Sequence, residues 1–554
     1  MKKLLKKIKI WMIASLVGVA SLTLVSFDDN TTFEIAKNLD IYYTLFRELN
    51  LYYVDDTKPG DLIKKSIDAM LTSLDPYTVY IPESQMEDFR FMTTGQYGGV
   101  GALIRKDGEY VVITEPYEGF PAQKNGINAG DVILEIDGQS IKGKNSSEVS
   151  DMLKGQPKTL LKLKLKRPGT TDPIEKNIER EEIKIDAVPY YGVFSDSIGY
   201  INLSSFTESA YADVKKALLD LKEKQNVKSI IFDLRGNPGG LLIEAVNITN
   251  LFVPKAESIV STKGKVKDWD KNYTAAMSPV DTEMPIVILV NSGSASASEI
   301  VSGAIQDLDR GVIIGQRTFG KGLVQTTRPL SYNAKLKITT AKYYTPSGRC
   351  IQALDYTHRN PDGSVGKIPD SLVTEFKTKN GRSVYDGGGV SPDVLLESEQ
   401  LSNLSGSLYN KNLFFDFATE FAIKHIIISK ITEFKITDEI YNEFIEFLKD
   451  KNYDYETQSE EDLKLLTEST KEEKYFDLVK EEIEVLKKML AHDKNKDLQV
   501  FKPEIKQLLL EEIVSRYYFQ KGRLQALLQG DPAMNEAIAI LKDKARYNSI
   551  LHLK

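Results

Sequence analysis

The stretch "MPIVILVNSGSASASEIVSGAIQDL", residues 284–308, decides the fold class of this sequence. It opens on an apolar run, passes through four serines separated by small residues, and ends in an amphipathic helical pattern. A flexible linker has such a composition, but linkers do not usually separate a buried strand from a helix. We interpret 292–299 as a tight strand-to-helix turn. Two explanations of its serines are open at this point: a serine N-cap, or a nucleophile on the turn.

The same alternation of apolar strands and amphipathic helices extends over the region around this turn. It includes "VKSIIFDLRGNPGG", residues 227–240, and "GVIIGQRTFG", residues 311–320. Such alternation predicts a mainly parallel sheet covered on both faces. The segment 322–349 has a more antiparallel character. The fold class is therefore multidomain α/β.

Composition narrows the class of function. The 554 residues carry a formal net charge of −7, so the composition does not show the excess of basic residues that nucleic-acid-binding proteins have. The single cysteine, Cys350, excludes disulfides within the chain and a cysteine-rich zinc site. The 4 histidines have no metal-site spacing, and none lies before residue 358. We therefore expect no metal and no cofactor.

The N-terminus predicts export. "MKKLLKKIK" is a basic segment, and an uncharged apolar run follows it up to Asp28. This pattern is typical of a signal peptide, and the run is also barely long enough for one membrane anchor. We expect a periplasmic protein, or one anchored in the inner membrane and facing the periplasm. The predicted organisation is a signal or anchor (1–27), an N-terminal helical region (28–92), a PDZ domain (93–170), the α/β core (171–400) and a C-terminal helical extension (401–554).

The PDZ assignment depends on the order of elements after residue 93. A glycine-rich turn leads into a strand pair, then "AGDVILEIDGQSI", residues 129–141, a short helix and a last strand. This order resembles a PDZ domain, and a generic β-barrel is the alternative. The C-terminal extension is rich in Glu and Lys, which indicates solvated helices without a catalytic motif.

Two loops that follow apolar strands carry the candidate chemistry: "DLRGNPGG", Asp233 to Gly240, and the serine-rich turn at 292–299. Ligands bind at the carboxyl ends of strands in open α/β sheets. If Ser296 begins a helix, its hydroxyl lies near free N–H groups, which suits attack on a carbonyl. A serine nucleophile needs a base, and Lys321 in "TFGKGLV" is the available one because histidines are scarce. Lowering a lysine pKa to about 7–8 takes roughly 3–4 kcal/mol, which desolvation supplies where no carboxylate is near. The uncharged residues around Lys321 fit that requirement.

Together, "DLRGNPGG", "SGSASASEI" and "RTFGKGLVQ" resemble the C-terminal processing peptidases, also called tail-specific proteases. "SLDPYTVYIP", "KYYTPSGR" and "GGGVSPDV" extend the resemblance over roughly residues 35 to 400. The resemblance implies a Ser/Lys serine endopeptidase with Ser296 as nucleophile, Lys321 as base and Gln325 orienting the lysine. It also implies an oxyanion hole of backbone N–H groups, from Ala297 and from either Gly239 or Gly240. Asp307 matches a family aspartate that we expect to be structural.

The resemblance further implies polypeptide substrates with free C-termini, held by the PDZ domain. PDZ domains add a peptide to a sheet edge and hold its carboxylate in a nest of N–H groups. We expect this nest in "YGGVG", which comprises Tyr97, Gly98, Gly99, Val100 and Gly101, with Val100 in an apolar floor. One departure from the family is Lys154, where family PDZ domains often carry a coupling arginine; lysine cannot make a planar bidentate contact.

Two alternatives to a protease are a non-catalytic PDZ adaptor on a degenerate scaffold and an acyl-transfer or lipid-handling enzyme. Retention of Ser296, Lys321 and Gln325 argues against the adaptor. A lipid-handling enzyme would need no PDZ domain. A homo-oligomer, an adaptor protein partner and a single N-terminal membrane anchor are further possibilities that the sequence leaves open.

Overall fold

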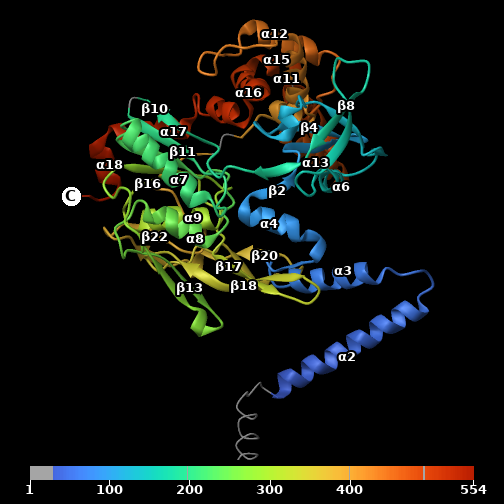
Figure 1. Cartoon of the computed structure of the whole chain (residues 1–554). Coiled ribbons are helices and arrows are strands. Elements are labelled where there is room, and N and C mark those ends of the chain that lie inside the picture. The colour runs from blue at the N-terminus through green and yellow to red at the C-terminus, as the bar shows by residue number, and fades with distance from the viewer. Residues whose placement is uncertain (1–28, 196, 398–399, 491–492, 554) are drawn as a thin grey trace, which may run out of the picture. The chain divides into compact units, whose positions relative to one another are not determined.

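The computed structural model describes residues 29–195, 197–397, 400–490 and 493–553 (Figure 1). The predicted signal or anchor, 1–27, lies outside the described residues. Within the described ranges, no helix combines the length and the apolar character needed to span a bilayer. The chain divides into two compact units, one up to Tyr80 and one from Ile81 onward. The first unit contains helices α2 (Asp29–Tyr52) and α3 (Pro59–Thr72).

The second unit begins with a PDZ domain built on an antiparallel sheet. Strand β7 shows how its sequence forms it: Leu161, Leu163 and Leu165 are fully buried, whereas the lysines between them point outward. The sheet order is β3-β4-β5-β7-β8, with β6 beside β5. Its strands are β3 (Ala102–Asp107), β4 (Tyr110–Pro116), β5 (Val132–Ile136), β6 (Gln139–Ser140), β7 (Leu160–Lys166) and β8 (Ile174–Glu179). The sheet therefore continues past residue 170, where we had expected the domain to end.

Short elements complete this domain. Helix α6 (Ser146–Leu153) begins at Asn145, whose side chain forms a capping box with Glu148. Helix α5 (Pro121–Lys124) packs beside β8. Before the sheet come η1 (Glu83–Gln85), α4 (Met86–Thr94) and β2 (Gln96–Gly99), and β2 pairs with β9 (Glu181–Lys184).

The α/β core contains the predicted mainly parallel sheet. Its order is β10-β11-β12-β15-β16-β23, and only the β10–β11 pair is antiparallel. All residues of β12 and β15 are buried, as a sheet covered on both faces requires. The strands are β10 (Tyr190–Phe194), β11 (Ile198–Asn202), β12 (Ser229–Asp233), β15 (Ile286–Val290), β16 (Val312–Gly315) and β23 (Val394–Leu395).

The two faces of this sheet are covered by helices from different parts of the chain (Figure 1). On one face, Phe232 and Ile288 pack with α7 (Ala210–Leu219, extended by a π-helical turn to Lys224), α8 (Leu242–Asn250) and α9 (Ala297–Asp307). On the other face, Ile231 and Leu289 pack with the last two helices, α17 (Pro532–Lys542) and α18 (Lys544–Ile550). The last two helices of the C-terminal extension are therefore part of the α/β core, where they cover one face of its sheet.

A second, antiparallel sheet follows the predicted antiparallel segment. Strand β18 (Lys335–Tyr344) pairs with β17 (Leu323–Pro329) and with β13 (Ser258–Gly264), which pairs with β14 (Lys271–Thr274). The remaining short elements are β1 (Val79–Ile81), η3 (Lys267–Trp269), β19 (Leu354–Arg359), β20 (Val365–Lys367), η4 (Asp370–Leu372), β21 (Glu375–Lys377) and β22 (Ser383–Tyr385).

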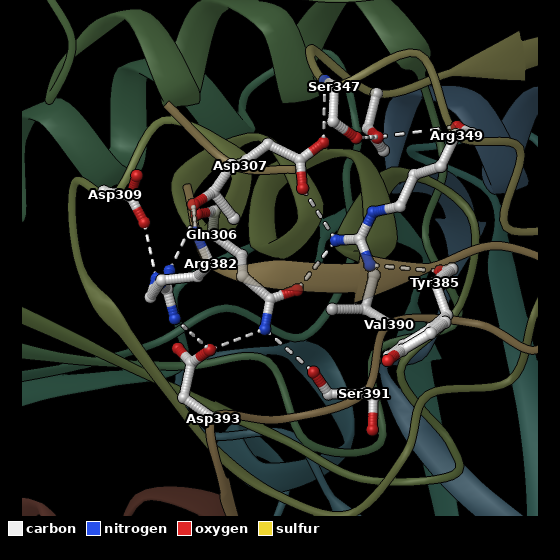
Figure 2. A network of polar contacts seen from close by, with 12 residues as sticks. Gln306, Asp307, Asp309, Ser347, Arg349, Arg382, Tyr385, Val390, Ser391 and Asp393 are labelled. Carbon is white, nitrogen blue, oxygen red and sulfur yellow. Dashed lines mark hydrogen bonds and ion pairs between the residues drawn. The ribbon is translucent and has the colours of Figure 1, made fainter. Parts of the chain in front are cut away.

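A buried polar network fixes the C-terminal end of α9 (Figure 2). The Asp307 carboxylate lies 2.8 Å from the Arg349 guanidinium, and both side chains are at most 1% exposed. Arg382 bridges Asp309 and Asp393 at 2.5 Å each. Asp307 thus has a structural contact, as expected, and the network holds α9 against the segments that follow β18.

The rest of the C-terminal extension forms a helical domain with its own aromatic core, which includes Phe414, Phe417 and Phe444. The domain contacts the PDZ domain, where Arg523 lies 2.7 Å from the nearly buried Glu115. Its helices are α10 (Asn403–Asn410), α11 (Leu413–Lys424), α12 (Asp438–Leu448), α13 (Gln458–Glu472), α14 (Phe476–Leu490), α15 (Lys494–Val500) and α16 (Lys502–Leu527).

Candidate active site

Ser296 is the N-cap residue of α9, on the predicted strand-to-helix turn after β15. Its backbone has φ 54° and ψ −110°, which is unusual for a residue that carries a β-carbon. Contacts on both sides hold it there. Its N–H donates to Glu299 Oε2 at 2.8 Å, and its carbonyl accepts the Tyr343 hydroxyl at 3.1 Å. A strained residue held in this way is typical of a functional site.

The serines beside Ser296 stabilise the turn. The Ser294 hydroxyl donates to the Leu234 carbonyl at 2.8 Å, and the Ser298 hydroxyl donates to the Asn237 carbonyl at 2.9 Å. Both serines are fully buried. Because Leu234 and Asn237 belong to "DLRGNPGG", these bonds fasten the serine turn to the glycine-rich loop, and the two predicted loops lie together.

Gly239 and Gly240 lie where a side chain would not fit. Gly239 has φ 99°, and a β-carbon there would lie 2.9 Å from Ser296 Cβ and from the Ala297 nitrogen. Gly240 has φ 147°, and a β-carbon there would lie 2.4 Å from the Phe206 carbonyl. Gly239 therefore permits a close approach of this loop to the serine turn, and Gly240 permits a close approach to the backbone of Phe206.

The hydrogen bonds of the two glycines differ. The Gly239 N–H donates to the side chain of Asn237 at 2.9 Å. Across the part of the chain that the structure describes, the N–H groups of Gly240 and Ala297 donate no hydrogen bond to the protein. Ala297, which follows Ser296, and Gly240, which follows the glycine that approaches Ser296, therefore carry unused donors.

Glu299, which we did not single out from the sequence, joins the serine turn to the lysine loop. Its carboxylate is fully buried and accepts four hydrogen bonds. Oε2 accepts from the N–H of Ser296 at 2.8 Å and of Lys321 at 2.9 Å; Oε1 accepts from the Gly320 N–H at 2.7 Å and the Thr318 hydroxyl at 2.6 Å. Burial raises the pKa of Glu299, and these four bonds counteract the rise. The Ser-x-x-Glu spacing of a capping box was the signal that could have indicated it.

Lys321 lies between β16 and β17 and is half-buried. Its neighbouring glycines pack tightly: a β-carbon at Gly320 would lie 2.4 Å from Ala353 Cβ, and one at Gly322 would lie 2.8 Å from the Gln352 nitrogen. The expectation that no carboxylate lies near this loop is wrong. The fold brings Glu299, which is remote in sequence, to the backbone N–H of Lys321.

Gln325 lies on β17, four residues after Lys321, and is half-buried. Its Nε2 donates to the Thr339 hydroxyl on β18 at 3.1 Å. This bond fixes the direction of the amide, at a point where the pairing of β17 with β18 shifts register.

The predicted carboxylate nest lies at the start of the edge strand of the PDZ sheet. Strand β3 pairs only with β4 among the described strands, and α6 lies beside it. Tyr97, Gly98 and Gly99 belong to β2 and pair with β9, so they are already part of a strand. Val100 is buried and Gly101 has φ 73°. Near this groove, Lys154 makes an ion pair of 2.5 Å with Asp88 of α4.

Comparisons with known proteins match three parts of the chain. Residues 197–365 match peptidase family S41, residues 112–167 match a PDZ domain, and residues 404–541 match the family described as "Probable PDZ-protease, C-terminal helical domain". A "Carboxy-terminal-processing protease" from Bartonella bacilliformis is 38% identical over 351 residues, which cover 63% of this chain and 79% of that protein. The chain belongs to peptidase family S41, the C-terminal processing peptidases.

A second curated relative agrees with this assignment, and the chain is also similar to a solved structure. A "Probable CtpA-like serine protease" from Staphylococcus aureus is 33% identical over 429 residues, covering 75% of this chain and 82% of that protein. Among solved structures, the "Photosystem II D1 C-terminal processing protease" is 30% identical, covers 65% of this chain and 88% of that chain, and has a TM-score of 0.35. The predicted family and the predicted combination of domains in this S41 peptidase are confirmed.

Proposed function

We propose that this S41 peptidase cleaves polypeptides at or near their C-termini with a Ser296–Lys321 dyad. The observation that carries the proposal is the shared carboxylate of Glu299, because one buried group holds the backbones of both residues. Gln325 orients the lysine from β17. In this proposal Lys321 acts in its neutral form, which a general base requires.

The chemistry follows from these positions. Neutral Lys321 takes the proton of the Ser296 hydroxyl as Oγ bonds to the substrate carbonyl carbon. The carbonyl electrons move to oxygen, and the resulting oxyanion accepts hydrogen bonds from the N–H groups of Ala297 and Gly240. As the carbonyl re-forms, the C–N bond breaks and the protonated lysine gives its proton to the leaving amine. Lys321 then takes a proton from water, whose oxygen attacks the acyl carbon. The ester bond to Ser296 Oγ breaks, and Oγ takes the proton back from Lys321, which restores the enzyme.

Gly240 is the better candidate for the second oxyanion donor. The N–H of Gly239 is already used by the Asn237 side chain, whereas that of Gly240 donates to no described residue. The N-terminus of α9 adds a favourable dipole at the same place. Gly239 contributes by its lack of a side chain, which lets the loop approach Ser296.

The PDZ domain is proposed to hold the substrate C-terminus. The unpaired edge of β3 accepts an extended peptide, and the N–H groups of Val100 and Gly101 face its carboxylate at the start of that strand. Val149 and Leu153 of α6 are buried in the same apolar core as Val100; a preference for small or apolar terminal residues is part of the proposal.

We also propose that the enzyme is in the periplasm, either soluble or anchored in the membrane, because residues 1–27 consist of a basic segment and an apolar run. Mass spectrometry of the mature N-terminus tests this proposal.

Incubation of an unfolded protein with wild-type enzyme, Ser296→Ala and Lys321→Arg tests the dyad. Both variants should fold and lose cleavage, because alanine lacks the nucleophile and arginine stays protonated. Ser294→Ala is the matched serine control and should retain most activity. Cleavage by folded Ser296→Ala would contradict the dyad, and absence of cleavage by wild type would favour the adaptor.

A pair of peptides that differ only in a free or amidated C-terminus tests the PDZ role. Amidation removes a charged acceptor, a loss of about 1.5–3 kcal/mol, so we expect a fall in cleavage efficiency of roughly tenfold or more. Equal cleavage of both peptides would show that the PDZ domain does not read the C-terminus.

A further inference from the structure

The C-terminal extension reaches the glycine-rich loop through one ion pair. Arg235 immediately precedes Gly236 in that loop. Its Nε and Nη2 donate to the Asp233 carboxylate at 2.7–3.1 Å, and its Nη1 lies 2.6 Å from Asp531 Oδ2. Asp233 also accepts the hydroxyl of Tyr200 at 2.8 Å. The guanidinium is therefore held on two sides, by a core strand and by a residue nearly 300 positions later in the chain.

Asp531 uses its two carboxylate oxygens for different purposes. Oδ1 is the N-cap of α17 and accepts from the N–H groups of Ala533 at 2.8 Å and Met534 at 3.3 Å. Oδ2 faces Arg235, and the aspartate side chain is only 11% exposed. Helix α17 itself is fixed, because Met534 and Ala537 are buried against the core sheet. Asp531 is thus a firm anchor for the loop.

The path from this anchor to the reacting serine is short. The residue after Arg235 donates its N–H at 2.8 Å to the side chain of Asn291, which directly precedes the serine turn. Three residues further along, Gly239 lies so near that turn that a β-carbon on it would be 2.9 Å from Ser296 Cβ. A change in the position of Arg235 therefore moves the loop that supplies the Gly240 N–H.

We propose that Asp531 is a positioning residue for catalysis: through Arg235 it fixes the loop that forms the oxyanion hole. This inference rests on the proposed function of that loop. It gives the C-terminal extension a role in the reaction, because Asp531 of the extension forms an ion pair with Arg235 of the glycine-rich loop. Asp531 does not touch the substrate; it acts through Arg235.

Asp531→Asn separates the two tasks of the residue. Asparagine caps helices as well as aspartate, so α17 stays formed, whereas the charge that faces Arg235 is lost. We expect kcat for a short peptide to fall roughly tenfold with little change in KM. The affinity for a peptide aldehyde, whose hemiacetal places an oxyanion in the hole, should fall by a similar factor. Asp531→Ser, also a good N-cap without charge, is the second variant.

Asp543→Asn is the matched control. Asp543 caps α18 in the same extension by accepting from the Arg546 N–H at 3.0 Å, and it lies outside the catalytic loop. It should leave kcat and aldehyde affinity unchanged. Melting temperatures of all variants show whether a loss reflects folding.

Three results would overturn the inference: wild-type kcat and aldehyde affinity in both Asp531 variants, losses that follow the melting temperature, or equal losses in Asp543→Asn. The dyad proposal is judged separately by Ser296→Ala. If Ser296→Ala is inactive while Asp531→Asn behaves as wild type, only the role of Asp531 fails.

Discussion

Replacing Glu299 by glutamine tests the central feature of the site, because it preserves shape and removes one acceptor. All four neighbours of the carboxylate are donors in the structure. The amide nitrogen of glutamine cannot accept, so some of these donors lose their partner. Which ones lose it depends on the direction of the amide.

The structure allows the two directions to be compared. If nitrogen replaces Oε2, the N–H groups of Ser296 and Lys321 are both left unpaired, at a cost of about 2–6 kcal/mol. If nitrogen replaces Oε1, the Gly320 N–H is left unpaired. The Thr318 oxygen, which already accepts the Val390 N–H, can accept from the new amide, but the Thr318 O–H then loses its acceptor, so this arrangement also costs about 2–6 kcal/mol. We expect the second arrangement, because it leaves one backbone N–H unpaired instead of two and gains a bond to Thr318, with unfolding free energy lowered by about 2–6 kcal/mol.

The effect on catalysis follows from where this cost falls. Gly320 adjoins Lys321, so its displacement shifts the base relative to the nucleophile. If roughly 1.4–2.8 kcal/mol of the cost appears in the transition state, kcat/KM falls about ten- to a hundredfold. Denaturant unfolding and peptide cleavage, measured on the same preparation, check both numbers.

Glu244→Gln is the control for this experiment. Glu244 is a buried glutamate of α8 that accepts the Tyr211 N–H at 2.8 Å, away from Ser296. Its replacement should reduce stability without reducing activity per folded molecule. Wild-type stability and wild-type kcat/KM in Glu299→Gln would refute the reasoning that this carboxylate sets the spacing of the dyad.

Three further predictions concern other parts of the molecule. Gly239→Ala should abolish cleavage, whereas Gly236→Ala should reduce it only slightly, because Gly236 has φ 69° but open space around a β-carbon. Similar activities of the two variants would contradict the close approach of Gly239 to the serine turn. Asp307→Asn should lower unfolding free energy by about 3–5 kcal/mol, because Arg349 stays buried without its partner; an unchanged denaturation midpoint would argue against that. Burial raises the pKa of Glu511 to about 7, so the stability that its protonated form contributes is lost as pH rises through 7. Glu511→Gln should therefore flatten the pH dependence of the melting temperature between about pH 5 and 8. An unaltered profile would count against this prediction.

Local sequence patterns predicted much of the fold. The order of elements after residue 93 predicted a last strand, which is β7, and the apolar run "MPIVILVN" predicted the buried strand β15. The serine-rich turn predicted the start of α9 at Ser296. These signals work because side-chain period and helix capping depend on residues close together in the chain.

The resemblance to a known family added what periodicity could not. It implied the nucleophile and base roles for Ser296 and Lys321, which the loops had already suggested, and it added Gln325; the comparisons confirm the family. Their catalytic roles remain predictions for the variants above. The nest at Tyr97–Gly101 was predicted as one loop, but pairing of β2 with β9 places its first three residues in a strand.

The sequence by itself determined the elements, the order of the domains and the two loops that carry the chemistry. Only the tertiary structure decided that Glu299 joins the serine turn to the loop of Lys321 and that Asp531 pairs with Arg235 of the glycine-rich loop. It also decided that α17 and α18 cover the second face of the core sheet. The physical reason is that a buried carboxylate or an apolar face needs partners in space, and these partners lie tens to hundreds of residues away, where no local pattern records the pairing.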